Sequence, residues 1–192
     1  MIDTERLLLR PWREEDRPAF EALASTPGMT ARVGGLRNRA QIDAMFARRL
    51  EDQARFGHCY WAMELRGTGK LVGSCGIRIA GNYGYAPVAG LAEIGWRVAE
   101  RYWGRGLARE AAMASIDWGW ANLDAPVIGA WTTIGNKRSW GLMERLGMKR
   151  RADMDFRHAD YGPDDPAGAM IVYLIERPHG RPAATGPAAG AA

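Results

Sequence analysis

Cysteine and histidine are scarce in this chain of 192 residues, which has two cysteines and three histidines. The histidines are scattered, and Cys59 and Cys75 show no spacing typical of a metal site. Both cysteines lie in strand-like segments, where a free cysteine behaves as a small buried apolar residue. We therefore expect no metal site, no disulfide and no cysteine nucleophile.

The sequence also lacks a long apolar run. A membrane-spanning helix needs about 18 or more consecutive apolar residues, and no segment approaches that length. The N-terminus, with Asp3, Glu5 and Arg6, has no apolar core of a signal peptide. These absences predict a cytoplasmic protein with no membrane partner.

A strong charge imbalance is missing as well. The net charge is +4 and the isoelectric point is about 9.3, but the basic residues are interleaved with acidic ones and form no stripe or tail. Nucleic-acid-binding proteins usually cluster lysine and arginine on one face, so we expect no nucleic-acid partner. The mild positive excess suits a polyanionic cofactor instead.

Length and composition indicate one domain followed by a short tail. An apolar content of 47% over 192 residues is ordinary for a globular domain. Residues 178–192 are rich in alanine, glycine and proline and have no means of burying apolar surface. We expect residues 1–177 to form the domain and residues 178–192 to be disordered.

Strand-like and helix-like segments alternate along the domain, which indicates the α/β class. Ile42, Met45, Phe46 and Leu50, for example, have the spacing of a helix face. Strands are expected at residues 7–11, 60–65, 70–79, 91–98, 127–133, 150–156 and 169–176. Helices are expected at residues 14–24, 41–56, 105–122 and 137–146.

A run that begins at Arg101, Arg-Tyr-Trp-Gly-Arg-Gly-Leu-Ala-Arg, joins a strand-like segment to a helix-like one. Gly104 and Gly106 let the backbone approach a ligand closely. The first turn of a helix leaves unpaired N–H groups, and its dipole favours an anion there. With Arg101, Arg105 and Arg109 adding positive charge, this turn predicts a site for a phosphorylated cofactor.

Two common phosphate-binding loops do not fit this run. A Walker A loop needs a lysine followed by serine or threonine, and no such pair follows these glycines. A dinucleotide fingerprint needs a third glycine where Arg109 stands. Asp124 lies at about the right distance for a ribose-binding acid, but it precedes the next strand instead of ending it.

The run is instead similar to the Arg/Gln-x-x-Gly-x-Gly/Ala motif with which GNAT-superfamily N-acetyltransferases bind the pyrophosphate of acetyl-CoA. Residues 102–108 resemble the form found in the branch of the ribosomal-protein acetyltransferases RimJ and RimL. Residues 136–148 resemble that branch's Asn-x-x-Ser-x-x-Val-Met-Glu-x-Leu-Gly segment, and residues 4–12 resemble its first strand. The likeness covers roughly residues 2–177 in one order.

This resemblance implies a GNAT fold of the α/β (α+β) type. Its central sheet is mixed but mostly antiparallel, with about six to seven strands and helices on both faces. It also implies an enzyme that transfers acetyl directly from acetyl-CoA to a primary amine in a ternary complex, and a homodimer is a further expectation. The rival class is a non-catalytic module that binds or senses acyl-CoA. The residues expected at the cofactor are Trp96, Arg97, Val98, Arg101, Tyr102, Trp103, Gly104, Arg105, Gly106, Leu107, Ala108 and Asn136.

Two residues are candidates for the chemistry. Glu93 matches the position at which several GNAT enzymes carry a catalytic glutamate, and burial in general raises a carboxyl pKa towards the range that base catalysis requires. The alternative is that Glu93 forms an ion pair with a nearby arginine and holds the substrate loop, and a glutamate at this position can also orient the amine through water. Ser139 matches the serine suspected of protonating the CoA thiolate, although Gly141, where valine is common, would loosen its helix. Asn136 is expected to cap that helix and, by resemblance, to contact the pantetheine arm.

The acceptor amine is left open by the sequence. A protein N-terminus, a polyamine, an aminoglycoside or an amino-acid-like metabolite are all compatible with the motifs. The acceptor pocket is expected to form from residues 28–56 and 157–168, the segments least bound to the family pattern. Backbone amides near Val98 are expected, by resemblance, to polarise the thioester carbonyl.

Overall fold

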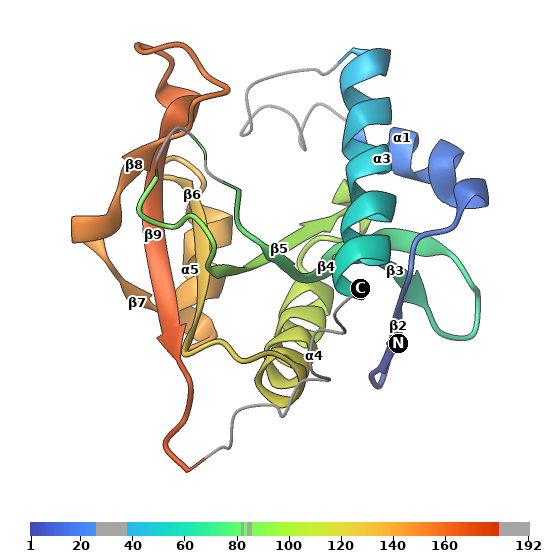
Figure 1. Cartoon of the computed structure of the whole chain (residues 1–192). Helices are drawn as coiled ribbons and strands as arrows, with labels where there is room; N and C mark the ends of the chain where they lie inside the picture. Colours follow the sequence, from blue (N-terminus) through green and yellow to red (C-terminus); the bar gives the residue numbers. More distant parts are fainter. Residues whose placement is uncertain (26–37, 82, 84–85, 181–192) are drawn as a thin grey trace, which may run out of the picture.

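A nine-stranded sheet runs through the structure, a computed structural model that describes residues 1–25, 38–81, 83 and 86–180 (Figure 1). The strands are β1 (Ile2–Asp3), β2 (Leu7–Arg10), β3 (Tyr60–Leu65), β4 (Leu71–Ile79), β5 (Ala92–Val98), β6 (Val127–Thr133), β7 (Lys149–Arg150), β8 (Phe156–Arg157) and β9 (Ala169–Glu176). The helices are α1 (Arg17–Ala24), α3 (Arg39–Phe56), α4 (Leu107–Asn122) and α5 (Lys137–Arg145), with short 3-10 turns at Glu14–Asp16, Glu100–Tyr102, Ala152–Met154 and Pro166–Gly168.

The order of the strands is β1-β2-β3-β4-β5-β6-β9-β7, with β8 beside β9. All neighbouring pairs are antiparallel except β5 and β6, which are parallel. A mixed, mostly antiparallel sheet with helices on both faces confirms the fold expected from the sequence. The count exceeds seven because β1, β7 and β8 are two-residue strands.

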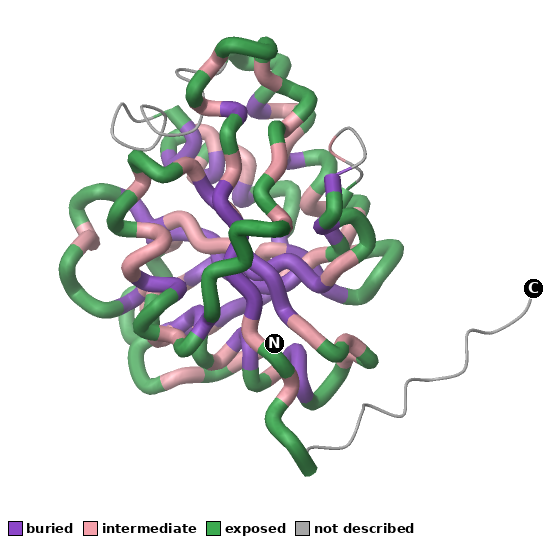
Figure 2. Tube along the Cα trace, turned by 90° about the vertical axis from the view of Figure 1, so that its left-hand side faces the viewer, coloured by how far each residue is buried: buried purple, intermediate pink, exposed green. Residues whose placement is uncertain are grey.

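Helix α4 covers one face of the sheet, and α1 and α3 lie on the other side of the N-terminal strands (Figure 1). Trp118 of α4 packs edge-on against Trp61 of β3, with ring centroids 4.7 Å apart. On the other side, Phe46 of α3 contacts Phe20 of α1 and Trp12, at 5.2 and 5.8 Å. The sheet is therefore buried on both faces, and its central strands carry the buried core seen in Figure 2.

The local sequence explains where α3 begins. Asn38 precedes the helix, and its side-chain oxygen accepts a hydrogen bond from the backbone N–H of Gln41 at 2.9 Å. The Gln41 side chain in turn accepts from the backbone N–H of Asn38 at 2.9 Å. This reciprocal capping box satisfies two amides that the first turn would otherwise leave unpaired.

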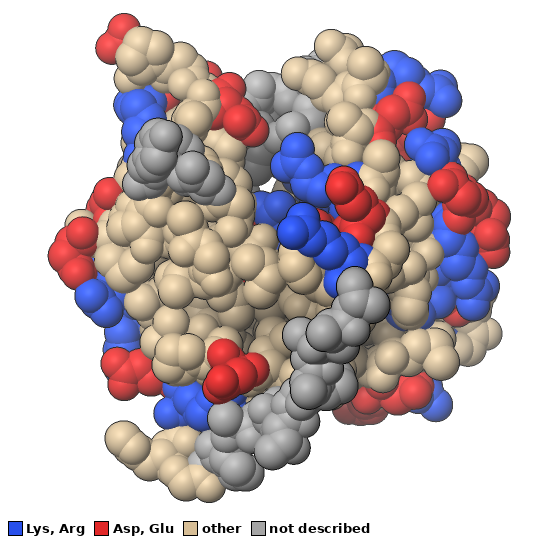
Figure 3. Space-filling model, in the orientation of Figure 1, with Lys and Arg blue, Asp and Glu red and all other residues tan. Residues whose placement is uncertain are grey.

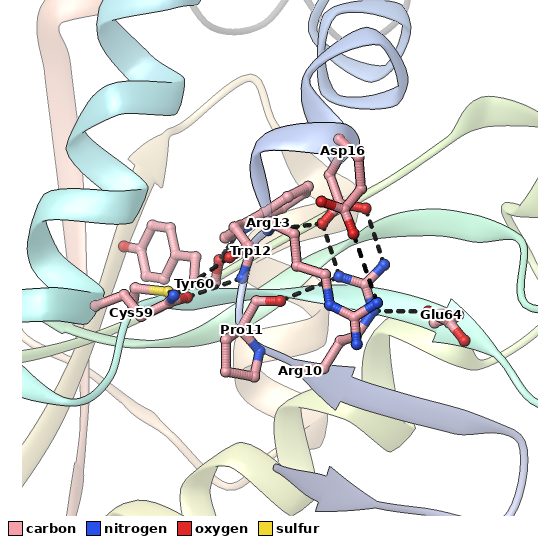
Figure 4. A network of polar contacts seen from close by, with 10 residues as sticks. Arg10, Pro11, Trp12, Arg13, Asp16, Cys59, Tyr60 and Glu64 are labelled. Atoms are coloured by element: carbon pink, nitrogen blue, oxygen red, sulfur yellow. Dashed lines mark hydrogen bonds and ion pairs between the residues drawn. The ribbon is translucent and has the colours of Figure 1, made fainter.

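A buried ion-pair network ties β2 to the turn that precedes α1 (Figure 4). Arg10 donates to both carboxylate oxygens of Asp16, at 2.7 and 2.9 Å, and to Glu64 of β3 at 2.7 Å. Next to it, the indole nitrogen of Trp12 donates to the backbone carbonyl of Tyr60 at 2.6 Å. These contacts hold the start of β3, and with it the Tyr60 ring, in a defined position.

Two expectations from the sequence need correction. The strand expected at residues 150–156 is wrong: β7 and β8 are separated by a 3-10 turn, because the Asp155 carboxylate accepts the Val172 N–H at 3.1 Å in place of a strand carbonyl. The helix expected from residue 14 begins with a 3-10 turn, and α1 starts at Arg17. Of the expected tail, residues 181–192 lie outside the described residues.

Candidate functional site

The glycine-bearing turn at the start of α4 has the backbone that an anion site requires. Gly104 and Gly106 have φ values of +76° and +77°, a region that favours glycine. Gly106 is the N-cap of α4, and no side chain caps the helix there. The amides of its first turn are therefore directed to a ligand or to solvent, as at other phosphate-binding helix ends.

A cavity of about 850 Å³ opens at this turn, between the start of α4, the end of β5 and helix α5. Ten of the twelve residues expected at the cofactor line it, together with Ser139. Arg101 and Arg105 do not. The lining residues are Trp96, Arg97, Val98, Tyr102, Trp103, Gly104, Gly106, Leu107, Ala108, Arg109, Asn136, Lys137, Arg138, Ser139, Leu142 and Arg145.

The charged side chains around this cavity, which is the larger of two described cavities, are all of one sign. Its lining contains Arg97, Arg109, Lys137, Arg138 and Arg145, and no aspartate or glutamate. The sequence indicated only Arg97 and Arg109 as residues of this site. It did not indicate the three basic residues of α5, because their approach to the turn depends on how the helices pack. A basic, acid-free wall of this kind suits a polyanionic ligand.

Arg101 and Arg105 belong to the loop but do not line the larger cavity. Their guanidinium groups are 5.0 and 5.4 Å from the ring centroid of Tyr102. The guanidinium of Arg138 lies over the Trp103 ring at 4.6 Å. These stacked cations support the aromatic residues of the loop and add positive charge at its rim.

The larger cavity reaches a gap between β5 and β6. The two strands pair only at Ala92 and Glu93, whereas β5 continues to pair with β4 as far as Val98. Ala99 donates its N–H to Val72 of β4, so in an antiparallel ladder the amide and carbonyl of Val98 point away from β4, towards the gap. The indole nitrogen of Trp103 donates to this carbonyl at 2.6 Å, which leaves the Val98 N–H as a donor in the gap.

Asn136 and Ser139 both line the larger cavity, as expected for two residues three apart on a helix. The capping role expected for Asn136 is wrong in one respect. It stands at the N-cap of α5, but its side chain makes no capping hydrogen bond. Its side-chain nitrogen donates instead to the hydroxyl oxygen of Thr132 at 2.9 Å, because the tight turn after β6 brings the two residues together.

A second, smaller cavity of about 160 Å³ lies on the opposite face of the sheet and contains Glu93. In Figure 3 a hollow separates α3 from the β8 and β9 edge, and basic and acidic side chains gather on its α3 side. The sequence did not single out most residues of this smaller cavity. Its lining consists of Arg78, Tyr83, Glu93, Trp131, Thr132, Thr133, His158, Tyr161 and Met170.

Glu93 is 8% exposed and is held by two neighbours. Arg78, its cross-strand partner on β4, donates from Nε at 3.0 Å and lies with Nη2 at 2.9 Å from the same carboxylate oxygen. The Tyr83 hydroxyl donates to that oxygen at 2.7 Å. The arginine ion pair that was one of the two roles considered for Glu93 is therefore present.

Tyr60 lies next to this pair. A Cβ at Gly95 would lie 2.8 Å from the Tyr60 hydroxyl oxygen, so glycine makes room for the ring. Burial, followed by the negative charge of Glu93, raises the pKa of Tyr60 well above its usual value. Burial alone would lower the pKa of Arg78, but Tyr60 and Glu93 raise it. Both groups therefore keep their ordinary protonation states at neutral pH.

Aromatic rings form the outer wall of the smaller cavity. The Tyr83 ring lies 4.5 Å from His158 and 5.9 Å from Trp131, and His158 lies 5.5 Å from Tyr161. His158 and Tyr161 belong to the 157–168 segment expected at the acceptor pocket. Of the other expected segment, residues 28–37 lie outside the described residues.

The remaining sequence expectations concern cysteines, metals and membranes. Cys59 and Cys75 are free and fully buried, and burial raises the pKa of each thiol to about 12, which makes them poor nucleophiles. In the described part of the chain no cluster of three or more histidine, cysteine, aspartate or glutamate side chains could hold a metal ion. Among the described helices, none is long and apolar enough to cross a membrane.

Comparison with known proteins gives a consistent result. The family described as acetyltransferase (GNAT) domain matches residues 6–149. The uncharacterised N-acetyltransferase YoaA of Bacillus subtilis is 27% identical over 182 residues, covering 93% of this chain and 97% of YoaA. An acetyltransferase structure from Agrobacterium tumefaciens superposes with a TM-score of 0.74 at 28% identity, covering 91% of this chain and 93% of the other.

A more distant neighbour shares the fold alone. The spermidine N-acetyltransferase of Vibrio cholerae, solved in complex with CoA and spermine, superposes with a TM-score of 0.68 at 15% identity. The alignment covers 91% of this chain and 97% of that protein.

Proposed function

The chain belongs to the GNAT acetyltransferase family, and from this premise we propose that it transfers an acetyl group from acetyl-CoA directly to a primary amine. The observation that carries the proposal is a pair of cavities on opposite faces of the sheet, one beside the anion-binding turn and one at Glu93, with the diverging strands β5 and β6 between them. Acetyl-CoA occupies the larger cavity and the amine enters the smaller one.

Cofactor binding in this proposal begins at the start of α4. The amides of Gly104 and Gly106 face the pyrophosphate, and the basic residues of the larger cavity balance its charge. The pantetheine arm runs past Asn136 towards the gap between β5 and β6. The Val98 N–H, which points into this gap, donates to the thioester carbonyl and stabilises the oxyanion as the amine attacks.

The amine approaches from the side of Glu93. We propose that Glu93 orients the amine, because one of its carboxylate oxygens already accepts from Arg78 and Tyr83 and is held in place by them. An α-amino group with a pKa of about 8 is partly neutral at cellular pH, whereas a lysine-type amine with a pKa of about 10.4 needs a base. Attack of the neutral amine on the thioester carbonyl forms the C–N bond and breaks the C–S bond. In this proposal the nitrogen loses its proton to solvent, and the leaving CoA thiolate takes a proton from the Ser139 hydroxyl, which regains one from solvent.

The size and lining of the smaller cavity limit what enters it. A volume of about 160 Å³ is below the range of about 300–1,000 Å³ for pockets that enclose a whole ligand, so it accommodates only the amine-bearing end of an acceptor. The rest of the acceptor lies outside, near His158 and Tyr161. A protein N-terminus fits this requirement, as does a small-molecule amine, and the polyamine bound by the Vibrio cholerae neighbour belongs among the candidates.

The finer assignments follow the sequence motifs. Residues 102–108 and 136–148 support placement in the RimJ/RimL-like branch, and the absence of a membrane-spanning helix among the described residues is compatible with a cytoplasmic enzyme. The alternative function is an acyl-CoA-binding module without catalysis. It would use the larger cavity but would have no need of the smaller one.

The test is a screen for CoA release. Purified protein and acetyl-CoA are incubated with a panel of peptides with free N-termini, polyamines, aminoglycosides and amino acids, and the free thiol is measured. We expect amine-dependent release above hydrolysis for at least one class. Tight acetyl-CoA binding with no release on any amine would favour the binding module, and no binding at all would overturn the proposal.

A further inference from the structure

The first sequence motif, residues 4–12, has a part that neither the core nor the proposed chemistry explains. Arg10 and Trp12 belong to the buried network of Figure 4. Thr4 and Arg6 do not, and both contact Glu110 in the first turn of α4, more than one hundred residues along the chain. Because Glu110 is the fourth residue of α4, these contacts join the N-terminal strands to the proposed pyrophosphate loop.

The Glu110 carboxylate is saturated by donors from this segment. One oxygen accepts from the Thr4 hydroxyl at 2.6 Å and from the Arg6 backbone N–H at 2.8 Å. The other accepts from Arg6 Nε at 2.7 Å and lies 2.6 Å from Arg6 Nη2. Burial alone would raise the pKa of Glu110, but the hydrogen bonds from Thr4 and Arg6 lower it, so the group is ionised at neutral pH.

The remaining Arg6 nitrogen contacts the loop itself. Nη1 donates to the backbone carbonyl of Arg105 at 2.9 Å, and a Cβ placed on Gly106 would lie 3.4 Å from Nη2. The peptide between Arg105 and Gly106 is trans, as are all the described peptide bonds. In a planar trans peptide the N–H points opposite to the C=O. Holding the Arg105 carbonyl on Arg6 therefore directs the Gly106 N–H away from Arg6.

From these contacts we propose that Arg6 is a positioning residue for the cofactor, acting through the loop and not by touching acetyl-CoA. It directs the Gly106 amide towards the larger cavity that Gly106 lines. It also neutralises Glu110, whose negative charge would otherwise lie one helical turn from the pyrophosphate and repel it. This inference rests on the proposed function, since it requires that the cavity binds acetyl-CoA.

The experiment compares Arg6→Ala with the wild-type protein and with Arg151→Ala as the matched control. The Arg151→Ala substitution also removes one positive charge and one ion pair with a carboxylate, that of Asp153 at 2.7 Å. Arg151 makes no described contact with the loop. Affinities for CoA are measured by calorimetry, and Michaelis constants are measured for acetyl-CoA and for S-acetylpantetheine, which lacks the diphosphate. We expect Arg6→Ala to weaken CoA binding by at least about tenfold, the size of one lost charge-assisted hydrogen bond. Arg151→Ala should not change it.

S-acetylpantetheine distinguishes a role of Arg6 in positioning the loop amides from a general loss of folded structure. Arg6→Ala should leave the Michaelis constant for S-acetylpantetheine unchanged, because that molecule never reaches the loop amides. Equal losses with both cosubstrates would show that Arg6 only supports the fold and would overturn the proposal, as would unchanged CoA affinity. If Arg6→Ala does not fold, Arg6→Lys serves instead, because lysine keeps the charge but cannot reach Glu110 and the Arg105 carbonyl together.

A double variant tests whether Arg6 acts partly by neutralising the charge of Glu110. Adding Glu110→Gln to Arg6→Ala removes the uncompensated carboxylate and should recover part of the lost affinity. Absence of any recovery would contradict the neutralising role. Failure of the wild-type protein to bind CoA would instead count against the proposed function, so the two failures are distinguishable.

Discussion

The side-chain nitrogen of Asn136 donates a hydrogen bond to the hydroxyl oxygen of Thr132 at 2.9 Å, although the two residues line different cavities. Asn136 faces the larger cavity and Thr132, which is 8% exposed, faces the smaller one. The bond therefore lies at the boundary where, in the proposed reaction, the acetyl group passes to the amine. A change at Thr132 should affect both substrates.

Thr132→Val removes this acceptor while keeping the shape of the side chain. We expect kcat/KM to fall by up to about tenfold, because the net worth of one neutral hydrogen bond is about 0.5–1.5 kcal/mol. The Michaelis constant for acetyl-CoA should rise as Asn136 loses its anchor. Thr133→Val is the control, since Thr133 lines the same smaller cavity but has no described side-chain hydrogen bond. Equal effects of the two variants would exclude a specific role for Thr132.

Gly104→Val should sharply weaken acetyl-CoA binding. A β-branched side chain is strained at φ +76° and would obstruct the approach of a pyrophosphate to the loop amides. Gly67→Val is the matched control, because Gly67 has a φ of +79° and open space around it, and lies in the β3–β4 turn. Calorimetry should show weak binding only for Gly104→Val. Unchanged affinity in a folded Gly104→Val protein would refute the assignment of the loop.

Glu93→Gln distinguishes the two roles considered for this carboxylate. If Glu93 orients the amine, the Michaelis constant for the amine should rise while the pH profile keeps its shape and acetyl-CoA affinity is unchanged. A general base would instead cost about 10²–10⁴-fold in kcat, with partial recovery at pH values above the pKa of the amine. Near-native rates at every pH would remove Glu93 from the reaction. Asp153→Asn, an exposed carboxylate remote from both cavities, is the control.

The buried Arg10–Asp16 pair should contribute to stability in a pH-dependent way. Burial alone would raise the pKa of Asp16, but hydrogen bonds from the Arg10 side chain and the Arg13 backbone lower it. Because the pKa is lower in the folded state, the pair contributes its full stabilisation at pH values above the pKa of an aspartate in the unfolded chain, about 3.9. This stabilisation is lost as the pH falls below that value. Asp16→Asn should therefore be less stable at pH 7, by about 1–3 kcal/mol, because Arg10 loses one carboxylate partner but keeps Glu64. It should also lose less stability between pH 5 and pH 2.

Urea unfolding of the wild-type protein and Asp16→Asn at several pH values measures this effect. Asp3→Asn is the control, because the Asp3 side chain pairs with Arg66 but is 69% exposed. Exposed pairs contribute at most about 1 kcal/mol. A pH dependence for Asp16→Asn identical to that of the wild-type protein would show that Asp16 does not contribute in this way.

Dimer formation was predicted from aromatic residues that look exposed in the sequence and from the resemblance to the RimJ/RimL branch, and sedimentation velocity tests it. We expect a dimer at micromolar concentrations, whether or not it dissociates on further dilution. A single monomeric species across the whole concentration range would refute it.

The sequence alone determined the parts of this protein that depend on local spacing. The glycines before α4 predicted a turn with positive φ angles that leads into a helix with no side-chain cap, because both are properties of a few consecutive residues. Strand β6 was predicted with its observed bounds, and the fold and family were recognisable because three motifs stand in the expected order. The buried cysteines followed in the same way, from strand-like surroundings.

Only the tertiary structure decided which side chains meet across the sheet. Arg78 and Tyr83 at Glu93 and Arg6 at Glu110 are contacts between separate segments, and no local pattern specifies them. The bond from Asn136 to Thr132 spans only four residues, but it depends on the turn that follows β6. The same reason explains the errors. Asn136 was expected to cap its helix, and residues 150–156 to form one strand, from propensity alone. In each case a side chain took a partner that the fold had brought within hydrogen-bonding distance, and that tertiary contact outweighed the local preference.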